Sequence, residues 1–280
     1  MNQTAPLGDA AVRRIGFGAM QLAGPGVFGP PADREAALAV LRRAVDLGVD
    51  HIDTAQYYGP DVVNDLIRDA LHPYPDGLRL VTKVGAAREA DGKWVPALAP
   101  EELRAGVEAN LRSLRVERMH LVNLRLMAGE APFDEQLAEM VKLREEGKLA
   151  HIGISNANRA QVEHALTLAE IAGVQNAYSV LDRAHDDVVE LCGERGLAFV
   201  PFFPLGSAFT GGPAKLAESP AVASVATKHG VTPAQVALAW LLHRGDHVLL
   251  IPGTGSVGHL EENLAAVELE LDADDLEALG

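Results

Sequence analysis

Short apolar runs alternate along the sequence with longer segments whose apolar residues recur at helical spacing. The apolar runs occupy residues 14–19, 51–55, 79–84, 120–125, 150–155, 174–178, 198–203 and 248–252. The helical segments occupy residues 34–48, 62–72, 100–114, 133–147, 159–173, 186–196, 232–245 and 257–267. Strands that alternate with helices of about 10–15 residues are typical of βαβ units and predict a parallel sheet. Eight strands and eight helices in this pattern predict a closed (β/α)8 TIM barrel rather than an open, doubly wound sheet.

No linker, low-complexity tract or internal repeat divides the 280 residues. Barrels of this class commonly form one domain of about 250 residues. We therefore predict a single α/β barrel domain over residues 1–280.

The composition is acidic, with 39 Asp and Glu against 24 Lys and Arg and a formal net charge of −15. Such a surface repels nucleic acid and anionic lipid, so we expect neither a nucleic-acid nor a membrane partner. The N-terminal residues lack the basic start and apolar run of a signal peptide. The single cysteine, Cys192, excludes an internal disulfide and agrees with a cytoplasmic location. We interpret Cys192 as a buried structural thiol, with a reactive thiol as the alternative.

Three side chains suited to proton transfer follow the second and third predicted strands. Asp53 lies at the end of the second strand, Tyr58 follows five residues later, and Lys83 lies at the end of the third. Barrel enzymes build their active sites at these C-terminal strand ends. An ammonium beside a phenol lowers the pKa of the tyrosine, and an aspartate keeps the lysine charged and aimed. We therefore predict that Tyr58 donates a proton to a carbonyl oxygen. Alternatively, each of the three residues alone could be an ordinary polar residue of the barrel rim. We interpret the neighbouring Tyr57 as part of the pocket wall.

These residues belong to motifs that resemble the aldo-keto reductase superfamily. The motifs are DTAQYYG at 53–59, TK at 82–83, GISN at 153–156, Gln175, PFFPLG at 201–206 and IPGTGSVGHLEENLAA at 251–266. The resemblance extends from GFGAM at 16–20 to the last predicted helix. It implies a (β/α)8 barrel in which Asp53, Tyr58 and Lys83 are catalytic.

The sequence departs from this family at the end of the fourth strand, where Arg125 stands in place of the usual histidine. Arginine remains cationic at any physiological pH, so Arg125 could favour the phenolate of Tyr58 or orient an anionic or phenolic substrate. Alternatively, Arg125 only pairs with Asp53 or with a loop carboxylate. His120 and His151 lie at strand beginnings, the face associated with stability, and are not predicted to be catalytic.

The sequence lacks both the Rossmann fingerprint and a P-loop. A better candidate for a phosphate-binding site than these glycine motifs follows the eighth strand, where IPGTGS leads into a helix that Ser256 could cap. A capped turn without a ligand is the alternative interpretation of this segment. The glycine-rich segment 24–31 is interpreted as a loop over the substrate or as an ordinary surface turn.

The resemblance implies NADPH as the cofactor. The implied cofactor-binding residues are Gly18, Met20, Asp53, Ser155, Asn156, Gln175, Phe202, Pro204, Leu205, Gly253, Thr254, Ser256, His259, Glu262 and Asn263. Among them Ser155, Asn156 and Gln175 would hold the nicotinamide carboxamide, and Phe202 would stack on the ring. The family often has basic residues at positions 253 and 259, so glycine and histidine there predict a looser grip on the 2′-phosphate.

The motifs are most similar to the bacterial pyridoxal reductase branch of this family, which implies NADPH-dependent reduction of pyridoxal to pyridoxine. The sequence stops soon after the last predicted helix, which favours an open site, and a general aldehyde or ketone reductase is the second hypothesis. An NADPH-binding regulatory subunit is a third, disfavoured because Asp53, Tyr58 and Lys83 are all present. A metal-dependent hydrolase is rejected. Such an enzyme needs histidines and carboxylates at its strand ends, and among those of this sequence only Asp53 is well placed. We expect a small-molecule aldehyde as partner and a monomer or weak homo-oligomer.

Overall fold

The structure is a computed structural model that describes residues 3–127, 132–206 and 211–280. Its centre is a parallel sheet with the strand order β11-β10-β9-β8-β5-β4-β3. The strands are β3 (Phe17–Gly18), β4 (His51–Asp53), β5 (Arg79–Val84), β8 (Met119–Arg125), β9 (Leu149–Ser155), β10 (Ile171–Gln175) and β11 (Ala198–Phe199).

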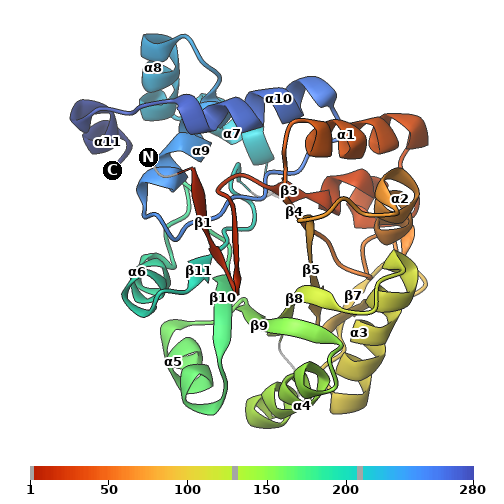
Figure 1. The fold of residues 1–280 in the computed structure, drawn as a ribbon. Coiled ribbons are helices and arrows are strands. Elements are labelled where there is room, and N and C mark those ends of the chain that lie inside the picture. The colour runs from red at the N-terminus through yellow and green to blue at the C-terminus, as the bar shows by residue number, and fades with distance from the viewer. Residues whose placement is uncertain (1–2, 128–131, 207–210) are drawn as a thin grey trace.

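Residues 248–250 close this sheet into a barrel. Val248 forms a parallel bridge with Phe199 of β11, and Leu250 forms one with Ile15, just before β3. The segment therefore lies between the two edge strands as the eighth strand of the barrel. The predicted (β/α)8 fold is confirmed, and the helices surround the strands (Figure 1).

Each predicted helical segment contains a helix of the structure. These helices are α1 (Arg34–Asp46), α2 (Val62–Leu71), α3 (Pro100–Leu114), α4 (Phe133–Glu145), α5 (Arg159–Leu168), α6 (Asp186–Arg195), α9 (Pro233–His243) and α10 (Val257–Ala265). Two of them begin at clear capping residues: the side chain of Thr232 accepts from the backbone N–H of Gln235, and that of Ser256 accepts from His259. Cys192 of α6 is fully buried, which raises the pKa of its thiol to about 12 and confirms a structural role.

The sequence pattern misplaced the boundary between α5 and β10. Residues 169–173 were predicted to be helical, but α5 ends at Leu168 and β10 begins at Ile171. Apolar residues in so short a run fit either period, and pairing with β9 decides the outcome, because Val174 lies opposite Ile154.

Several elements were not predicted. They are β1 (Thr4–Leu7), β2 (Ala10–Arg13), η1 (Ala19–Leu22), η2 (Pro25–Val27), β6 (Ala86–Arg88), β7 (Trp94–Pro96), α7 (Gly212–Glu218), α8 (Pro220–His229), η4 (Ala266–Glu268) and α11 (Ala273–Leu279). Within the described ranges, no helix combines the length and the apolar character that crossing a bilayer requires.

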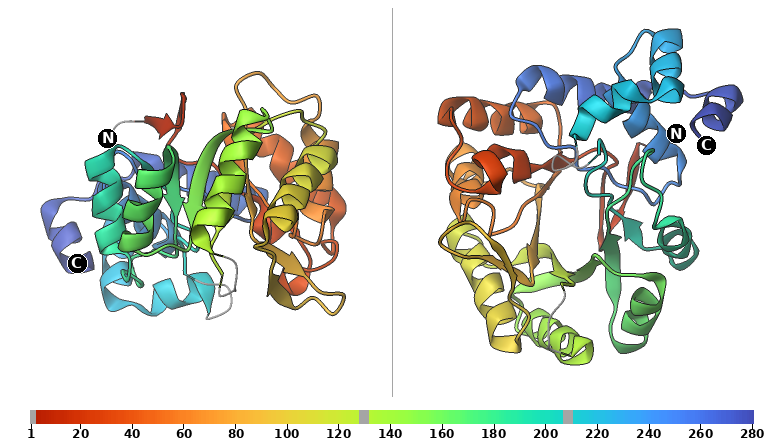
Figure 2. Two further views of the ribbon diagram at one scale, coloured as in Figure 1. Left: turned by 90° about the horizontal axis from the view of Figure 1, so that it is seen from below. Right: turned by 180° about the vertical axis from the view of Figure 1, so that it is seen from behind.

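The antiparallel hairpin β1–β2 lies across the end of the barrel where the strands begin (Figure 2). Its side chains Ala5, Leu7 and Val12 form one apolar cluster with inward-facing residues of the barrel, among them Val81 and Leu121. The hairpin therefore seals the barrel floor, and the opposite end, where the strands finish, remains for the candidate site.

Candidate active site

The strand ends bring the predicted site residues to one rim. Gly18 of β3 lies opposite Asp53 of β4, and Ser155 of β9 lies opposite both Arg125 of β8 and Gln175 of β10. This register follows from the parallel pairing, which aligns the C-terminal ends of neighbouring strands.

An ion pair forms the base of the site. The ammonium of Lys83 donates to Asp53 Oδ1 at 2.5 Å and to the backbone oxygen of Thr54 at 2.9 Å. Gln175 Nε2 donates to the other oxygen of Asp53 at 2.9 Å. Asp53 and Lys83 are 4% and 3% exposed, so both charges depend on each other and on these hydrogen bonds.

Tyr58 lies directly above this ion pair. The Lys83 Nζ atom is 5.1 Å from the centroid of the Tyr58 ring, and no hydrogen bond joins the two side chains among the described residues. Burial and the carboxylate of Asp53 raise the pKa of Tyr58 above its ordinary value, whereas Arg125 lowers it. The prediction that Lys83 would make this phenol more acidic is therefore wrong here: the ammonium is bound to Asp53, and desolvation dominates. The phenol is protonated at neutral pH, which is the form that a proton donor needs.

Arg125 faces the same space from β8. Its guanidinium lies 5.2 Å from the ring centroid of Phe202. Burial raises the pKa of both Tyr57 and Tyr58, and the positive charge of Arg125 opposes that rise. Within the described part of the chain it forms no ion pair, and Asp53 is bound by Lys83 and Gln175 instead. Pairing with Asp53 is thus not its role in this structure, while a partner within residues 128–131 would lie outside the described residues.

A single cavity of about 550 Å³ joins these groups. The predicted residues that line it are Gly18, Met20, Asp53, Tyr58, Lys83, Arg125, Phe202, Pro204, Leu205 and Gly253. This volume lies in the range of about 300–1,000 Å³ typical of ligand pockets. The cavity therefore spans both the proton-transfer groups and the loops after the seventh and eighth strands.

One aromatic side of this cavity was not predicted from the sequence. Trp94 of β7 lines the cavity and packs edge-on against Tyr57, with ring centroids 5.5 Å apart. Arg88 of β6 stacks 4.0 Å from the Trp94 ring and donates to the backbone oxygens of Gly26 and Val27. The sequence feature that could have indicated this contact is the long segment between the third strand and its helix, which contains one of the two tryptophans.

The segment 24–31 is thereby tied to the wall of the site. Besides the bonds from Arg88, the backbone of Gly59 donates to Val27 and that of Gly29 donates to Gly59. None of residues 24–31 lines the catalytic cavity, so the interpretation of this segment as a loop over the substrate stays a prediction.

Two buried polar atoms at the rim have no hydrogen-bond partner among the described residues, namely Ser155 Oγ and Gln175 Oε1. Leaving buried polar atoms unpaired is costly, so such atoms indicate a place for a polar ligand. Asn156 is held in place with a left-handed φ of 63°, and its amide donates to the oxygen of Leu126 at 2.9 Å.

The loop after the eighth strand forms the other end of the site. Gly18 and Gly253 meet where the first and eighth strands adjoin: a Cβ on Gly253 would lie 2.4 Å from the oxygen of Gly18. Thr254 Oγ1 accepts from the backbone of Ser256, which in turn caps α10. The remaining predicted residues lie on α10, where His259 and Glu262 are exposed and Asn263 is buried.

Comparisons with known proteins agree with this geometry. Residues 14–280 match the Aldo/keto reductase family. The chain is 48% identical to the pyridoxine 4-dehydrogenase of Escherichia coli, over 99% of this chain and 97% of that protein. An aldo/keto reductase from Klebsiella pneumoniae in complex with NADP and acetate is 27% identical with a TM-score of 0.81, covering 100% of this chain and 94% of that one. The Klebsiella pneumoniae aldo-keto reductase in complex with NADPH gives a TM-score of 0.83 at 27% identity, with the same coverage.

Proposed function

Because the chain belongs to the aldo/keto reductase family, we propose that it reduces pyridoxal to pyridoxine, with NADPH as the reductant and Tyr58 as the proton donor. The observation that carries the proposal is the meeting of Tyr58, the Asp53–Lys83 pair and Arg125 on one cavity. The 48% identity to a pyridoxine 4-dehydrogenase supports the choice of substrate.

Residues at the strand ends and in the loop before α10 fit the two ends of the cofactor. Ser155 and Gln175 each offer a buried polar atom that lacks a protein partner, as a carboxamide group requires. Ser256 and the first turn of α10 offer backbone N–H groups to a phosphate. When bound, NADPH supplies the hydride, and the protein supplies orientation and the proton.

Proton transfer to the aldehyde oxygen of the substrate depends on Tyr58 and the charged residues around it. As hydride reaches the aldehyde carbon, Tyr58 gives its phenolic proton to the oxygen, so that the product is a neutral alcohol. Asp53 holds Lys83 in place, with the ammonium 5.1 Å from the centroid of the Tyr58 ring. Arg125 stabilises the phenolate that remains, because it lowers the pKa of Tyr58.

Arg125 also gives a reason for choosing pyridoxal. This substrate is an aromatic aldehyde with a phenolate oxygen, and the guanidinium offers a counter-charge for that oxygen. The aromatic rings of Tyr57, Trp94 and Phe202 line the same cavity and suit a flat ring.

The deciding experiment follows oxidation of NADPH and of NADH by the purified protein against pyridoxal and a panel of uncharged aldehydes. We expect the highest kcat/KM with NADPH and pyridoxal. Equal kcat/KM across the panel would instead establish a general aldehyde reductase. Tight binding of NADPH with no turnover of any aldehyde would leave a regulatory subunit.

Replacing Arg125 with leucine should separate its role in substrate binding from its other effects. A charge-assisted hydrogen bond contributes about 1.5–3 kcal/mol, so we expect the KM for pyridoxal to rise about tenfold or more and the KM for benzaldehyde to change less. The same variant should shift the pH profile of pyridoxine oxidation. Oxidation needs the phenolate of Tyr58, and loss of the cation raises the pKa of Tyr58, so the rise in rate moves to higher pH.

Arg125→Lys is the matched control, since it keeps the charge and loses only the fork of donors. An equal rise in KM for both aldehydes in Arg125→Leu would refute the role of Arg125 as a counter-charge. An unchanged pH profile would refute its effect on Tyr58.

A further inference from the structure

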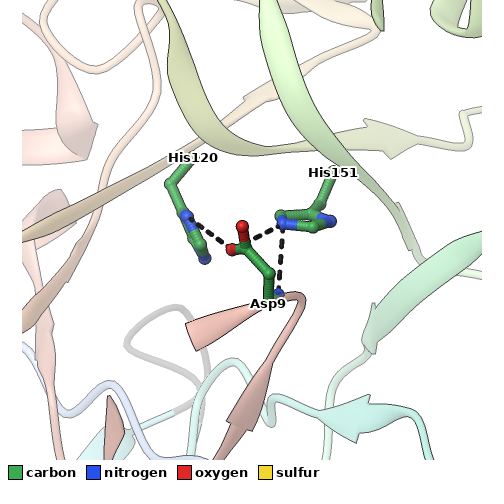
Figure 3. Close-up of side chains that lie close together, drawn as sticks. All are labelled: Asp9, His120 and His151. Atoms are coloured by element: carbon green, nitrogen blue, oxygen red, sulfur yellow. Dashed lines mark hydrogen bonds and ion pairs between the residues drawn. The ribbon is translucent and has the colours of Figure 1, made fainter. Parts of the chain in front are cut away.

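Three side chains with metal-binding atoms meet on the barrel floor, at the end away from Tyr58 (Figure 3). Asp9 is in the turn of the β1–β2 hairpin, and His120 and His151 lie near the beginnings of the neighbouring strands β8 and β9. Their ligand atoms all lie within 4.8 Å of one another. This floor cluster, Asp9 with His120 and His151, contributes nothing to the candidate active site.

The hydrogen bonds of His120 leave one ring nitrogen available. Its Nε2 atom lies 2.8 Å from the backbone oxygen of Leu7, which can only accept a hydrogen bond, so Nε2 carries the proton. The lone pair is therefore on Nδ1, which faces Asp9 Oδ1 at 3.9 Å. A backbone carbonyl on the far nitrogen is the usual way in which a metal-binding histidine is oriented.

The second histidine faces two groups with opposite demands. His151 Nε2 lies 3.2 Å from the backbone N–H of Asp9, which requires a lone pair on that nitrogen. The same atom lies 2.9 Å from Asp9 Oδ1, which requires a proton there. A neutral imidazole cannot satisfy both. With the lone pair on Nε2, a cation bound by this nitrogen and by the carboxylate removes the repulsion between their lone pairs and takes the place of the contact with the Asp9 N–H.

The distances suit a small divalent metal. Ligands at about 2.0–2.1 Å from a tetrahedral Zn²⁺ lie about 3.3 Å from each other. The two distances to Asp9 Oδ1, 2.9 Å from His151 and 3.9 Å from His120, lie on either side of this value. The Asp9 side chain is 77% exposed, so it is free to adjust and leaves a position open to water.

The surroundings permit the approach of the turn to His151. A Cβ on Gly8 would lie 2.3 Å from the His151 ring, so glycine is needed there for the turn to approach the ring so closely. Among the neighbouring charges, Arg144 lines the same hollow as Asp9 and His151 and is paired with Glu170.

We propose that Asp9, His120 and His151 bind one divalent transition metal of the Zn²⁺ type, and that this ion fastens the N-terminal hairpin to the barrel floor. Two imidazoles and one carboxylate suit Zn²⁺, Co²⁺ or Ni²⁺ better than Mg²⁺ or Ca²⁺. The site is independent of the reductase proposal, because its residues are remote from the catalytic cavity.

The test is titration of the tag-free, metal-stripped full chain with ZnCl₂ by calorimetry, and with CoCl₂ by visible absorption. We expect one equivalent of Zn²⁺ and the intense d–d absorption of Co²⁺ with a low coordination number. Asp9→Asn, His120→Gln and His151→Gln should each weaken the affinity about tenfold or more. His164→Gln is the matched control, because His164 forms an exposed pair with Asp134 at 2.7 Å and belongs to no such cluster among the described residues.

A second readout follows the hairpin itself. Zn²⁺ should raise the thermal unfolding midpoint of the unmodified protein and of His164→Gln, but not that of His151→Gln. Equal affinity in the floor variants and in the control would mean adventitious surface binding and would overturn the proposal. Binding of less than one equivalent, or octahedral Co²⁺ spectra that the variants share, would overturn it as well.

Discussion

Tyr58→Phe is expected to lower kcat for aldehyde reduction by about 100- to 10,000-fold, the usual contribution of a positioned general acid. The ring is retained, so its contacts with Tyr57, at 5.4 Å between centroids, and with Lys83 are preserved. The Tyr58 hydroxyl forms no hydrogen bond within the described part of the protein, so the free energy of unfolding should hardly change. Cofactor affinity, measured by fluorescence titration with NADPH, should also be unchanged.

Tyr57→Phe is the matched control for this experiment. The Tyr57 hydroxyl is buried and has no hydrogen-bond partner among the described residues, and its ring forms part of the cavity wall. We expect Tyr57→Phe to retain most of the turnover. A variant series in which Tyr57→Phe is inactive and Tyr58→Phe active would reverse the assignment of the proton donor.

Lys83→Met is expected to lower the free energy of unfolding by about 3–5 kcal/mol and to abolish most of the turnover. The change removes the ammonium that binds Asp53 at 2.5 Å and leaves a carboxylate that is only 4% exposed. Among the described residues, the side-chain hydrogen bond that remains to Asp53 comes from Gln175, and it cannot compensate for that charge. Urea denaturation of the two proteins measures the difference.

The double variant Asp53→Asn/Lys83→Met tests the cause. Removing both charges should restore much of the lost stability without restoring activity, because no uncompensated charge remains. Lys142→Met serves as the control for loss of a lysine, since Lys142 is 64% exposed and its pairing should contribute less than about 1 kcal/mol. A double variant as unstable as Lys83→Met would show that packing, not charge, determines the effect.

The barrel could be predicted because each strand and helix has a local signature. The apolar runs and the capping residues Thr232 and Ser256 depend on neighbours in the sequence, so the pattern identified the eight strands and their helices. The β1–β2 hairpin, α7 and α11 are short elements whose stability depends on docking to the barrel. Short segments of this kind have too few apolar positions to define a period.

The positions of the site residues could also be predicted from the sequence, but their electrostatics could not. Parallel strands must align their ends, so chain position alone placed Asp53, Lys83 and Arg125 on one rim. The pKa of Tyr58 could not be inferred in this way, because it depends on how far the phenol is desolvated and on which groups the ammonium contacts. Trp94 was missed because only the folded β6–β7 hairpin brings it against Tyr57.

The seam between the first and eighth strands has a consequence for how the chain reaches its native state. Ile15 pairs with Leu250, so the closing bridge joins positions near opposite ends of the sequence. Contacts of such long sequence separation form late, since loop closure must precede them. A nascent chain that ends before residue 248 exposes β3 and β11 as unpaired edges, which are open to intermolecular strand pairing until residues 248–250 are added.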